Sequence, residues 1–340
     1  MQDKGRYSFL GLILVLASLL LAGCNSTPPQ ANRPPVKTPE ATASNPAEQL
    51  IDKPILTTGC GKASPIQPGR TANQSIAVDP TVSKGSSVRN YLVHVPVGYA
   101  GTRQVPVVLA FHGHGGDAAG EESATGFSHL ANQDDFIAVY PQGLPDDQNL
   151  PFWASDGPID YGIDDALFVS NVLTQLQKDF CIDAQRIYAT GFSNGGGMSG
   201  FLACKLAGRI AAFAPVSGNY YAWPGGCNPG RAVPILEIHG TADSVVPYAG
   251  IPASVSPQWP LPPVPQWLQD WATRDGCAQR PLVFLQTPAV TGEHWVQCKA
   301  NATVVHYRME GEGHSLPDTI GGEATNALMW NFFQAHPLPD

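Results

Sequence analysis

The chain has 340 residues, of which 43% are hydrophobic and 14% charged, and its formal net charge is −9. This length suits one large domain preceded by a leader, and the negative charge argues against nucleic acid as a partner.

The first 23 residues have the pattern of a bacterial lipoprotein signal peptide. Lys4 and Arg6 precede an apolar run at residues 9–21, and small residues lead up to Cys24. The run is short for a membrane span, and a signal peptidase would cleave after Gly23 once Cys24 carries lipid. An ordinary secretory signal is the alternative. Either signal predicts a mature chain outside the cytoplasm.

Residues 24–57 are rich in proline, threonine, alanine, serine and asparagine and show no apolar periodicity. This composition predicts a tether, which in a polyproline-like state would reach about 90 Å from a membrane surface. We expect one folded domain over residues 58–340.

Within that domain, strand-like runs alternate with helical patterns. The predicted strands are residues 91–95, 107–111, 136–140, 187–190, 211–216, 235–239 and 304–309. Residues 165–180, with Asp164 as a possible N-cap, and residues 194–206 repeat apolar residues at helical spacing. Nearly continuous apolar strands such as 107–111 indicate a mostly parallel sheet covered on both faces, so the predicted fold class is α/β.

The sequence Gly191-Phe192-Ser193-Asn194-Gly195 lies between a predicted strand and a predicted helix. This is the pattern of a nucleophile elbow, in which a sharp turn exposes the Ser193 hydroxyl at a helix N-terminus that favours negative charge. In a chain with 35 glycines a simple Gly/Ser turn is the alternative.

A nucleophilic serine needs a general base and a carboxylate, which follow it in the order Ser, Asp, His in this kind of fold. Asp243 follows the predicted strand 235–239, although an Asp that only caps a turn fits the same position. Of the later histidines, His314 follows a predicted strand by a short Gly-containing loop. We interpret the other three as structural or surface residues: His294, His306 and His336.

Two backbone N–H groups are needed to bind an oxyanion. The first candidate is Asn194, which follows the nucleophile, and the second is His114 in the glycine-rich segment after strand 107–111. His112 and His114 also suggest a metal pair, but no third ligand has metal-site spacing. We therefore expect neither a metal nor another cofactor.

Several segments after residue 58 resemble the secreted feruloyl esterases of types C and D, which are relatives of the polyhydroxybutyrate depolymerase esterases and have the α/β-hydrolase fold. The segments are Gly59-Cys60-Gly61-Lys62, Val139-Tyr140-Pro141-Gln142-Gly143, Cys181-Ile182-Asp183, Arg186-Ile187-Tyr188-Ala189-Thr190-Gly191 and Ile210-Ala211-Ala212-Phe213-Ala214-Pro215-Val216-Ser217-Gly218. The resemblance implies that Ser193, Asp243 and His314 form the triad.

The chain departs from the family pattern at two positions. Phe192 stands where relatives often have Lys or Trp, and Leu316 stands where an aromatic residue is common. Both positions are expected to border the cleft, so the preference for an aromatic acid is less firmly implied than the triad. Tyr220, Tyr221, Trp223 and the proline-rich segment 251–265 would line or cover an aromatic cleft, or serve only in packing.

The seven cysteines indicate an oxidising compartment, with Cys24 used for lipid and six left for disulfides. Six cysteines permit fifteen pairings. Proximity in the sequence and the resemblance together imply the pairs Cys277–Cys298 and Cys204–Cys227, which leaves Cys60 with Cys181.

These features predict a monomeric, lipid-anchored serine carboxylic ester hydrolase. The resemblance implies release of ferulic or related hydroxycinnamic acids from plant cell-wall polysaccharide. The alternatives are a polyhydroxybutyrate or hydroxyalkanoate depolymerase, an acetylxylan esterase, and a non-catalytic polysaccharide-binding lipoprotein, since a fold does not guarantee chemistry.

Overall fold

A ten-stranded sheet organises the described part of the computed structural model, which comprises residues 50–155, 161–223 and 225–339. These residues belong to one compact unit, 45–340. The predicted signal peptide, Cys24 and most of the predicted tether lie outside the described residues. Of the helices that are described, none is long and apolar enough to cross a membrane.

The strand order in the large sheet is β1-β2-β4-β3-β7-β8-β9-β12-β11-β10. The central strands from β4 to β12 run parallel, and the outer pairs at both edges are antiparallel. The strands are β1 (Arg70–Ala77), β2 (Val88–Val95), β3 (Val105–Phe111), β4 (Ile137–Pro141), β7 (Ile182–Phe192), β8 (Ala212–Val216), β9 (Ile235–Gly240), β10 (Leu282–Gln286), β11 (Val290–Trp295) and β12 (Val304–Met309). The predicted mostly parallel sheet is confirmed.

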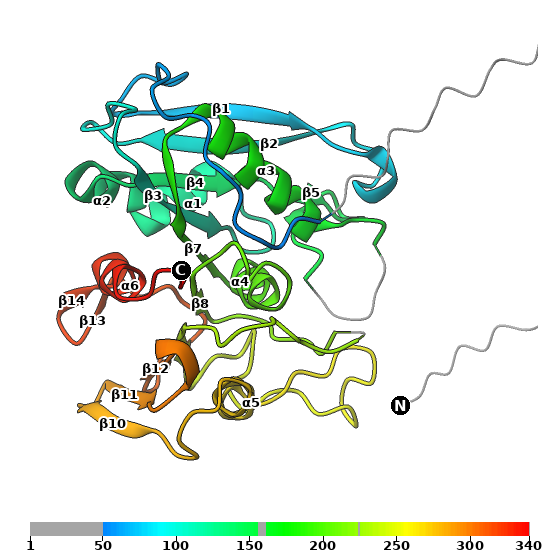
Figure 1. Cartoon of the computed structure of the whole chain (residues 1–340). Coiled ribbons are helices and arrows are strands. Elements are labelled where there is room, and N and C mark those ends of the chain that lie inside the picture. The colour runs from blue at the N-terminus through cyan, green and yellow to red at the C-terminus, as the bar shows by residue number, and fades with distance from the viewer. Residues whose placement is uncertain (1–49, 156–160, 224, 340) are drawn as a thin grey trace, which may run out of the picture. The chain divides into compact units, whose positions relative to one another are not determined.

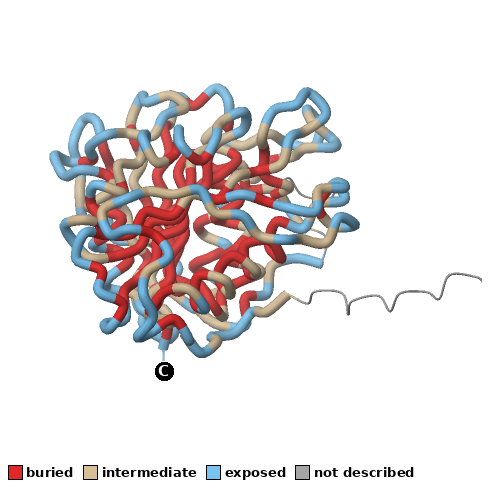
Figure 2. Tube along the Cα trace, turned by 90° about the horizontal axis from the view of Figure 1, so that it is seen from above, coloured by how far each residue is buried: buried red, intermediate tan, exposed pale blue. Residues whose placement is uncertain are grey.

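Helices cover both faces of the sheet (Figure 1), and apolar side chains fill the two interfaces. On one face lie α3 (Asp165–Asp179), α4 (Asn194–Lys205) and α5 (Val264–Arg274). On the other lie α1 (Ala118–Thr125), α2 (Phe127–Asp134) and α6 (Thr325–Gln334). Figure 2 shows buried segments of the chain at the centre and mostly exposed segments around them. Every residue of β3 is buried, because a central parallel strand packs on both faces.

The shorter elements lie in connections. Two small antiparallel pairs form, β5 (Leu144–Pro145) with β6 (Pro151–Phe152) and β13 (Thr319–Ile320) with β14 (Glu323–Ala324). Short 3₁₀ turns occur at Pro80–Val82 and Lys299–Asn301.

The predicted helix at 165–180 is confirmed as α3, whose N-cap Asp164 accepts a hydrogen bond of 2.8 Å from the Leu167 N–H. The predicted helix at 194–206 is α4. Three outer strands of the large sheet were not predicted: β1 and β10 at its two edges, and β11 beside β10.

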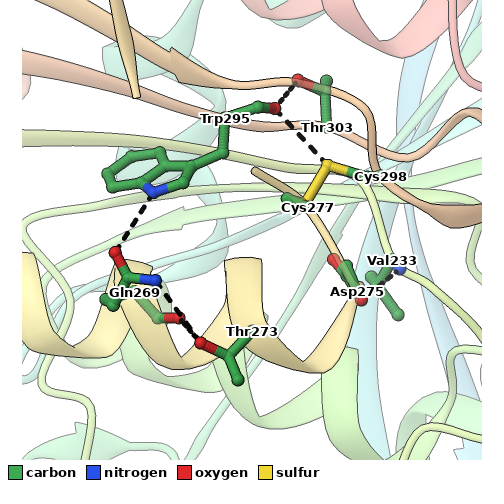
Figure 3. Close-up of a disulfide and its surroundings, with 8 residues drawn as sticks. All are labelled: Val233, Gln269, Thr273, Asp275, Cys277, Trp295, Cys298 and Thr303. Atoms are coloured by element: carbon green, nitrogen blue, oxygen red, sulfur yellow. Dashed lines mark hydrogen bonds between the residues drawn. A yellow bond between two sulfur atoms is a disulfide. The ribbon is translucent and has the colours of Figure 1, made fainter. Parts of the chain in front are cut away.

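Three disulfides join Cys60 with Cys181, Cys204 with Cys227 and Cys277 with Cys298. Figure 3 shows the last of these, where the end of α5 meets the segment that connects β11 to β12. Trp295 strengthens this junction because its Nε1–H donates to Gln269 on α5 at 3.3 Å, while its carbonyl accepts from Thr303 at 3.0 Å. The junction anchors β12, which leads to His314.

Candidate active site

Ser193 occupies a strained turn between β7 and α4. Its φ is 58° and its ψ is −122°, a conformation that a non-glycine residue rarely adopts. A side chain at Gly191 would collide with the Gly195 backbone, and one at Gly195 would collide with the Phe111 and His112 backbone, so these positions require glycine. The turn therefore has the geometry that the elbow pattern predicts.

The structure brings together the three side chains that the sequence selected. His314 Nε2 lies 2.8 Å from Ser193 Oγ, and His314 Nδ1 lies 2.7 Å from Asp243 Oδ2. The Asp243 side chain is fully buried, whereas the His314 side chain is 14% exposed. A proton can thus pass from the serine to a histidine whose other nitrogen faces a carboxylate.

The loop that carries Asp243 holds the carboxylate in one orientation. Asp243 Oδ1 accepts hydrogen bonds of 2.8 Å from the N–H groups of Val245 and Val246, which directs Oδ2 to His314. The Ala242 N–H donates to the Glu312 carbonyl at 2.9 Å, so a backbone hydrogen bond links the loop that carries Asp243 to the loop that carries His314.

Ser193, Asn194 and His114 line one open cleft of about 450 Å³. Asn194 begins α4, where the helix macrodipole favours negative charge. His114 is fixed by Asp146, whose Oδ2 lies 2.8 Å from His114 Nε2. The pKa of Asp146 lies below its ordinary value. The main cause is the hydrogen bond from the Leu150 N–H, and the hydrogen bond with His114 is the next largest. Gly113 leaves room beside the nucleophile, because a Cβ there would lie 3.3 Å from the Ser193 Cβ.

The Asn194 side chain has a role that the sequence did not indicate. Its Oδ1 accepts from the Trp153 N–H at 2.7 Å, and its Nδ2 donates to the Trp153 carbonyl at 3.1 Å and to Ser155 Oγ at 3.2 Å. These bonds connect the residue after the nucleophile to the buried residues Trp153 and Ser155, which follow β6.

His112 is a core residue. Its Nε2 accepts from the Gly143 N–H at 3.0 Å, and its Nδ1 lies 2.8 Å from the Gly113 carbonyl. Burial lowers the pKa of His112, which agrees with a neutral ring in these contacts. Within the described ranges no group of three or more His, Cys, Asp or Glu side chains could hold a metal ion.

The candidate aromatic residues divide between the cleft and its surroundings. Tyr221 lines the cleft with Ser193, together with Ile251 and Leu261 from the proline-rich segment. Tyr220 is buried and stacks on Trp267, with ring centroids 3.8 Å apart. Trp223, with Tyr221, lines a neighbouring pocket of about 510 Å³. Ile251 and Leu261 pair through backbone hydrogen bonds and line both hollows, so they form the partition between them.

The two departures from the family pattern lie elsewhere than expected. Phe192 packs on the His314 ring, with centroids 4.7 Å apart. Phe192 and Leu316 line a separate cavity of about 240 Å³ on the face covered by α1 and α6, whereas the residues around the Ser193 cleft do not include them. The expectation that they border the cleft is therefore wrong, because both side chains pack against the apolar residues on the face of the sheet covered by α1, α2 and α6.

The remaining histidines that the sequence set aside have structural contacts. His294 lies on β11 beside the Phe284 ring, and His336 Nδ1 lies 2.7 Å from the Phe332 carbonyl. His306 is buried on β12 next to Glu237.

Comparisons with known proteins agree with this architecture. A family model described as Phospholipase/Carboxylesterase matches residues 97–254. The feruloyl esterase B of Piromyces equi is 30% identical over 256 residues, which cover 74% of this chain and 46% of that protein. A probable feruloyl esterase C of Aspergillus clavatus is 30% identical over 258 residues, which cover 73% of this chain and 84% of that protein.

Among solved structures, the acetyl xylan esterase from Aspergillus awamori matches with a TM-score of 0.56 at 16% identity, over 78% of this chain and 99% of that one. This likeness shows the fold. The chain spans less than half the length of the Piromyces esterase, so it corresponds to one part of that protein. The fold and the matches over the catalytic domain show that the chain belongs to the type C and D feruloyl esterase family, on the α/β-hydrolase fold.

Proposed function

We propose that the protein is a serine carboxylic ester hydrolase in which Ser193 is the nucleophile, His314 the general base and Asp243 the residue that orients the base. The observation that carries the proposal is the continuous path from Ser193 Oγ through the His314 ring to Asp243 Oδ2, with contacts of 2.8 and 2.7 Å. The path begins at the wall of an open cleft, where an ester can reach the hydroxyl.

The reaction follows from these positions. His314 Nε2 takes the proton of Ser193 Oγ as the oxygen attacks the ester carbonyl carbon, and the N–H groups of Asn194 and His114 bind the resulting oxyanion. The intermediate collapses when His314 returns the proton to the leaving alcohol, which leaves an acyl-enzyme. Water, deprotonated by His314, then attacks the acyl carbon. The second intermediate collapses as His314 returns that proton to Ser193 Oγ, which releases the acid and the free serine.

The substrate class we propose is a hydroxycinnamic ester, such as a feruloyl group on plant cell-wall polysaccharide. The named relatives are feruloyl esterases. The cleft volume lies within the range of small-molecule sites, and its wall combines Tyr221 and Leu261 with the polar side chains of Asp146 and Asn219. An aromatic acid with a polar ring substituent fits such a mixed wall.

We further propose that the enzyme works outside the cytoplasm, held to a membrane by lipid on Cys24 and extended by the proline-rich residues between Cys24 and the compact unit. The predicted tether is shorter than residues 24–57, because Ile51, Ile55 and Thr57 are already hydrogen-bonded to α3 and β7. The three disulfides are typical of proteins that fold in an oxidising compartment. Metabolic labelling with a palmitate analogue tests the anchor. The label should enter the wild-type chain and be absent from C24A. Equal labelling of both chains would reject the lipid anchor on Cys24.

The substrate is tested by measuring ferulate released from methyl ferulate beside acetate released from acetylated xylan and 3-hydroxybutyrate released from its polymer. Acetylated xylan is included because a protein of this fold is an acetyl xylan esterase. We expect methyl ferulate to give the highest kcat/KM and S193A to lose all three activities. A higher kcat/KM for acetylated xylan or for the 3-hydroxybutyrate polymer would show that the enzyme's natural acyl group is not a hydroxycinnamoyl group. Polysaccharide binding by an enzyme inactive on every ester would indicate the non-catalytic binder.

A further inference from the structure

A buried cluster of charged and phenolic groups lies directly behind Asp243. It consists of Glu237 and His239 on β9, His306 on the neighbouring strand β12, and Tyr220 and Tyr248 from the loops that follow β8 and β9. We call these five residues the Glu237 cluster. Glu237 and His239 lie two residues apart on the same face of β9, and their side chains are 0% exposed.

The contacts of Glu237 favour its carboxylate form. Its Oε1 accepts from the Tyr220 hydroxyl at 3.0 Å and lies 2.9 Å from His239 Nδ1. Its Oε2 lies 2.8 Å from His306 Nδ1. Burial alone would raise the pKa of Glu237, but the hydrogen bonds and charges of the two imidazoles outweigh burial and lower it.

The contacts of His239 show that its ring carries two protons. Nδ1 faces the Glu237 carboxylate, while Nε2 lies 2.8 Å from the Val246 carbonyl. Both partners are acceptors, and a neutral imidazole has only one N–H to donate. Burial alone would lower the pKa of His239, but the hydrogen bond and charge of Glu237 reverse that effect and raise it. His239 is therefore an imidazolium paired with a buried carboxylate.

This cation touches the acid of the proposed triad. His239 Nε2 lies 3.3 Å from Asp243 Oδ2, the same oxygen that faces His314 Nδ1 at 2.7 Å. One carboxylate oxygen is thus shared by two imidazole rings, one buried and one in the cleft. The nearest nitrogens of the two rings are no more than about 6 Å apart, a distance at which like charges repel strongly in a buried site.

We propose that His239, held as an imidazolium by Glu237, is a positioning residue that orients the Asp243 carboxylate and offsets part of its negative charge at His314. The inference rests on the proposed function, because it assigns to His239 a role in the pH range over which that triad works. Without His239, the full charge of Asp243 would stabilise a protonated His314, which cannot accept the proton of Ser193.

The electrostatic neighbours of His239 come from several elements. Those on its own strand and the following loop are Glu237, Asp243 and Tyr248, and those from other elements are Tyr220, His306 and Arg308. Arg308 pairs in register with His239 and directs its Nε to Glu310 at 2.7 Å. Among the contacts of the described residues, Asp243 alone connects the cluster to His314.

The test measures how the rate of Ser193 labelling by a fluorophosphonate, and kcat/KM for methyl ferulate, depend on pH in wild type, H239Q and H306Q. In H239Q the acid limb of both profiles should move to higher pH by about 1–2 units, which corresponds to roughly 10- to 100-fold slower labelling below the limb. H306Q is the matched control, because the described side-chain contacts of the equally buried His306 are with Glu237 and Tyr248, and Glu237 keeps its contacts with His239 and Tyr220 in that variant. Its limb should stay within about 0.3 units of wild type.

Each outcome has a distinct meaning. If H239Q is slower but its limb coincides with that of wild type, His239 is only structural and the inference is wrong. If wild type is not labelled at Ser193, the proposed function itself fails, whatever H239Q does. If H239Q does not fold, histidine-ring NMR of the ¹⁵N-labelled wild-type protein decides: two ring N–H signals for His239 at pH 7.5 support the inference, and a neutral ring overturns it.

Discussion

Replacing Asp243 by Asn gives a sharply defined prediction, because the structure determines how the new amide must turn. Two N–H groups, from Val245 and Val246, donate to Asp243 Oδ1 at 2.8 Å, while Oδ2 faces His314 Nδ1. In D243N only the amide oxygen can accept from the two N–H groups, so the NH₂ must face His314. His314 Nδ1 then becomes an acceptor, and its proton sits on Nε2, beside Ser193. That nitrogen can no longer take the serine proton.

The size of the effect follows from the same contacts. Turning the amide over would lose two hydrogen bonds of about 1 kcal/mol each, which favours the unproductive orientation by up to roughly 30-fold, since the NH₂ then also faces the His239 ring nitrogen 3.3 Å away. The variant also loses the charge that stabilises the imidazolium, and a wrong tautomer costs about 10⁴ in kcat in serine proteases with a triad. We therefore expect D243N to lose about 10³- to 10⁴-fold in kcat, equivalent to about 4–5.5 kcal/mol in the barrier, with little change in KM.

The assay is steady-state release of ferulate from methyl ferulate, with thermal unfolding to check that the variant folds. Asp146 offers a matched control in the same cleft: its Oδ1 accepts from the N–H groups of Gln148 and Leu150, and its Oδ2 faces His114. D146N makes the same chemical change away from the base. Because Asp146 contacts His114 and lines the cleft, we expect a loss, but one of no more than about tenfold in kcat. A folded D243N enzyme within tenfold of wild-type kcat would refute the reasoning.

Two further predictions concern stability. The double variant C60A/C181A opens a link between residues 121 positions apart, so we expect it to lower the free energy of unfolding by about 4–5 kcal/mol in urea titrations; a loss below about 1 kcal/mol would contradict the expected constraint on the unfolded chain. Burial raises the pKa of Glu121 to about 8, and its Oε1 has no hydrogen-bond partner among the described residues. The folded state therefore binds a proton at Glu121 more tightly than the unfolded chain does. As pH rises from about 4.5 to about 8, the contribution of Glu121 to the free energy of unfolding falls by about 1.4 kcal/mol per pH unit. E121Q should flatten this slope, whereas D134N on the exposed side of α2 should leave it unchanged; an unchanged slope in E121Q would reject the buried-carboxyl explanation.

It could be predicted that Ser193, Asp243 and His314 lie close together, because each follows a central parallel strand in the chain. Ser193 follows β7, Asp243 follows β9 and His314 follows β12, and the carboxyl ends of parallel strands meet at one edge of the sheet. Periodicity and turn residues mark these ends locally. The relation between Ser193 and His314 therefore follows from local patterns plus one rule of topology.

Other features depend on pairings that local patterns do not mark. The strand β1 is largely polar, and Leu282, Val283 and Phe284 of β10 are all exposed, so neither strand shows a buried face that alternates. The Glu237 cluster needs the register of β9 against β12, which places His306 beside Glu237. A buried histidine within a strand does not by itself reveal its charged partner.

The direction in which side chains of loop residues point also could not be predicted from the sequence. Tyr220 and Tyr221 are consecutive, yet Tyr220 donates to buried Glu237 while Tyr221 lines the cleft. The Asn194 side chain is another case, because its partner Trp153 is 41 residues away in the chain. Such contacts are settled by packing between segments and not by composition or spacing.

The most direct test of the central claim is to treat the wild-type protein with a fluorophosphonate and map the modified peptide by mass spectrometry while ferulate release is followed. We expect one label per chain, on Ser193, and a loss of activity in proportion to labelling. A label on another residue, or full activity in protein labelled at Ser193, would contradict it.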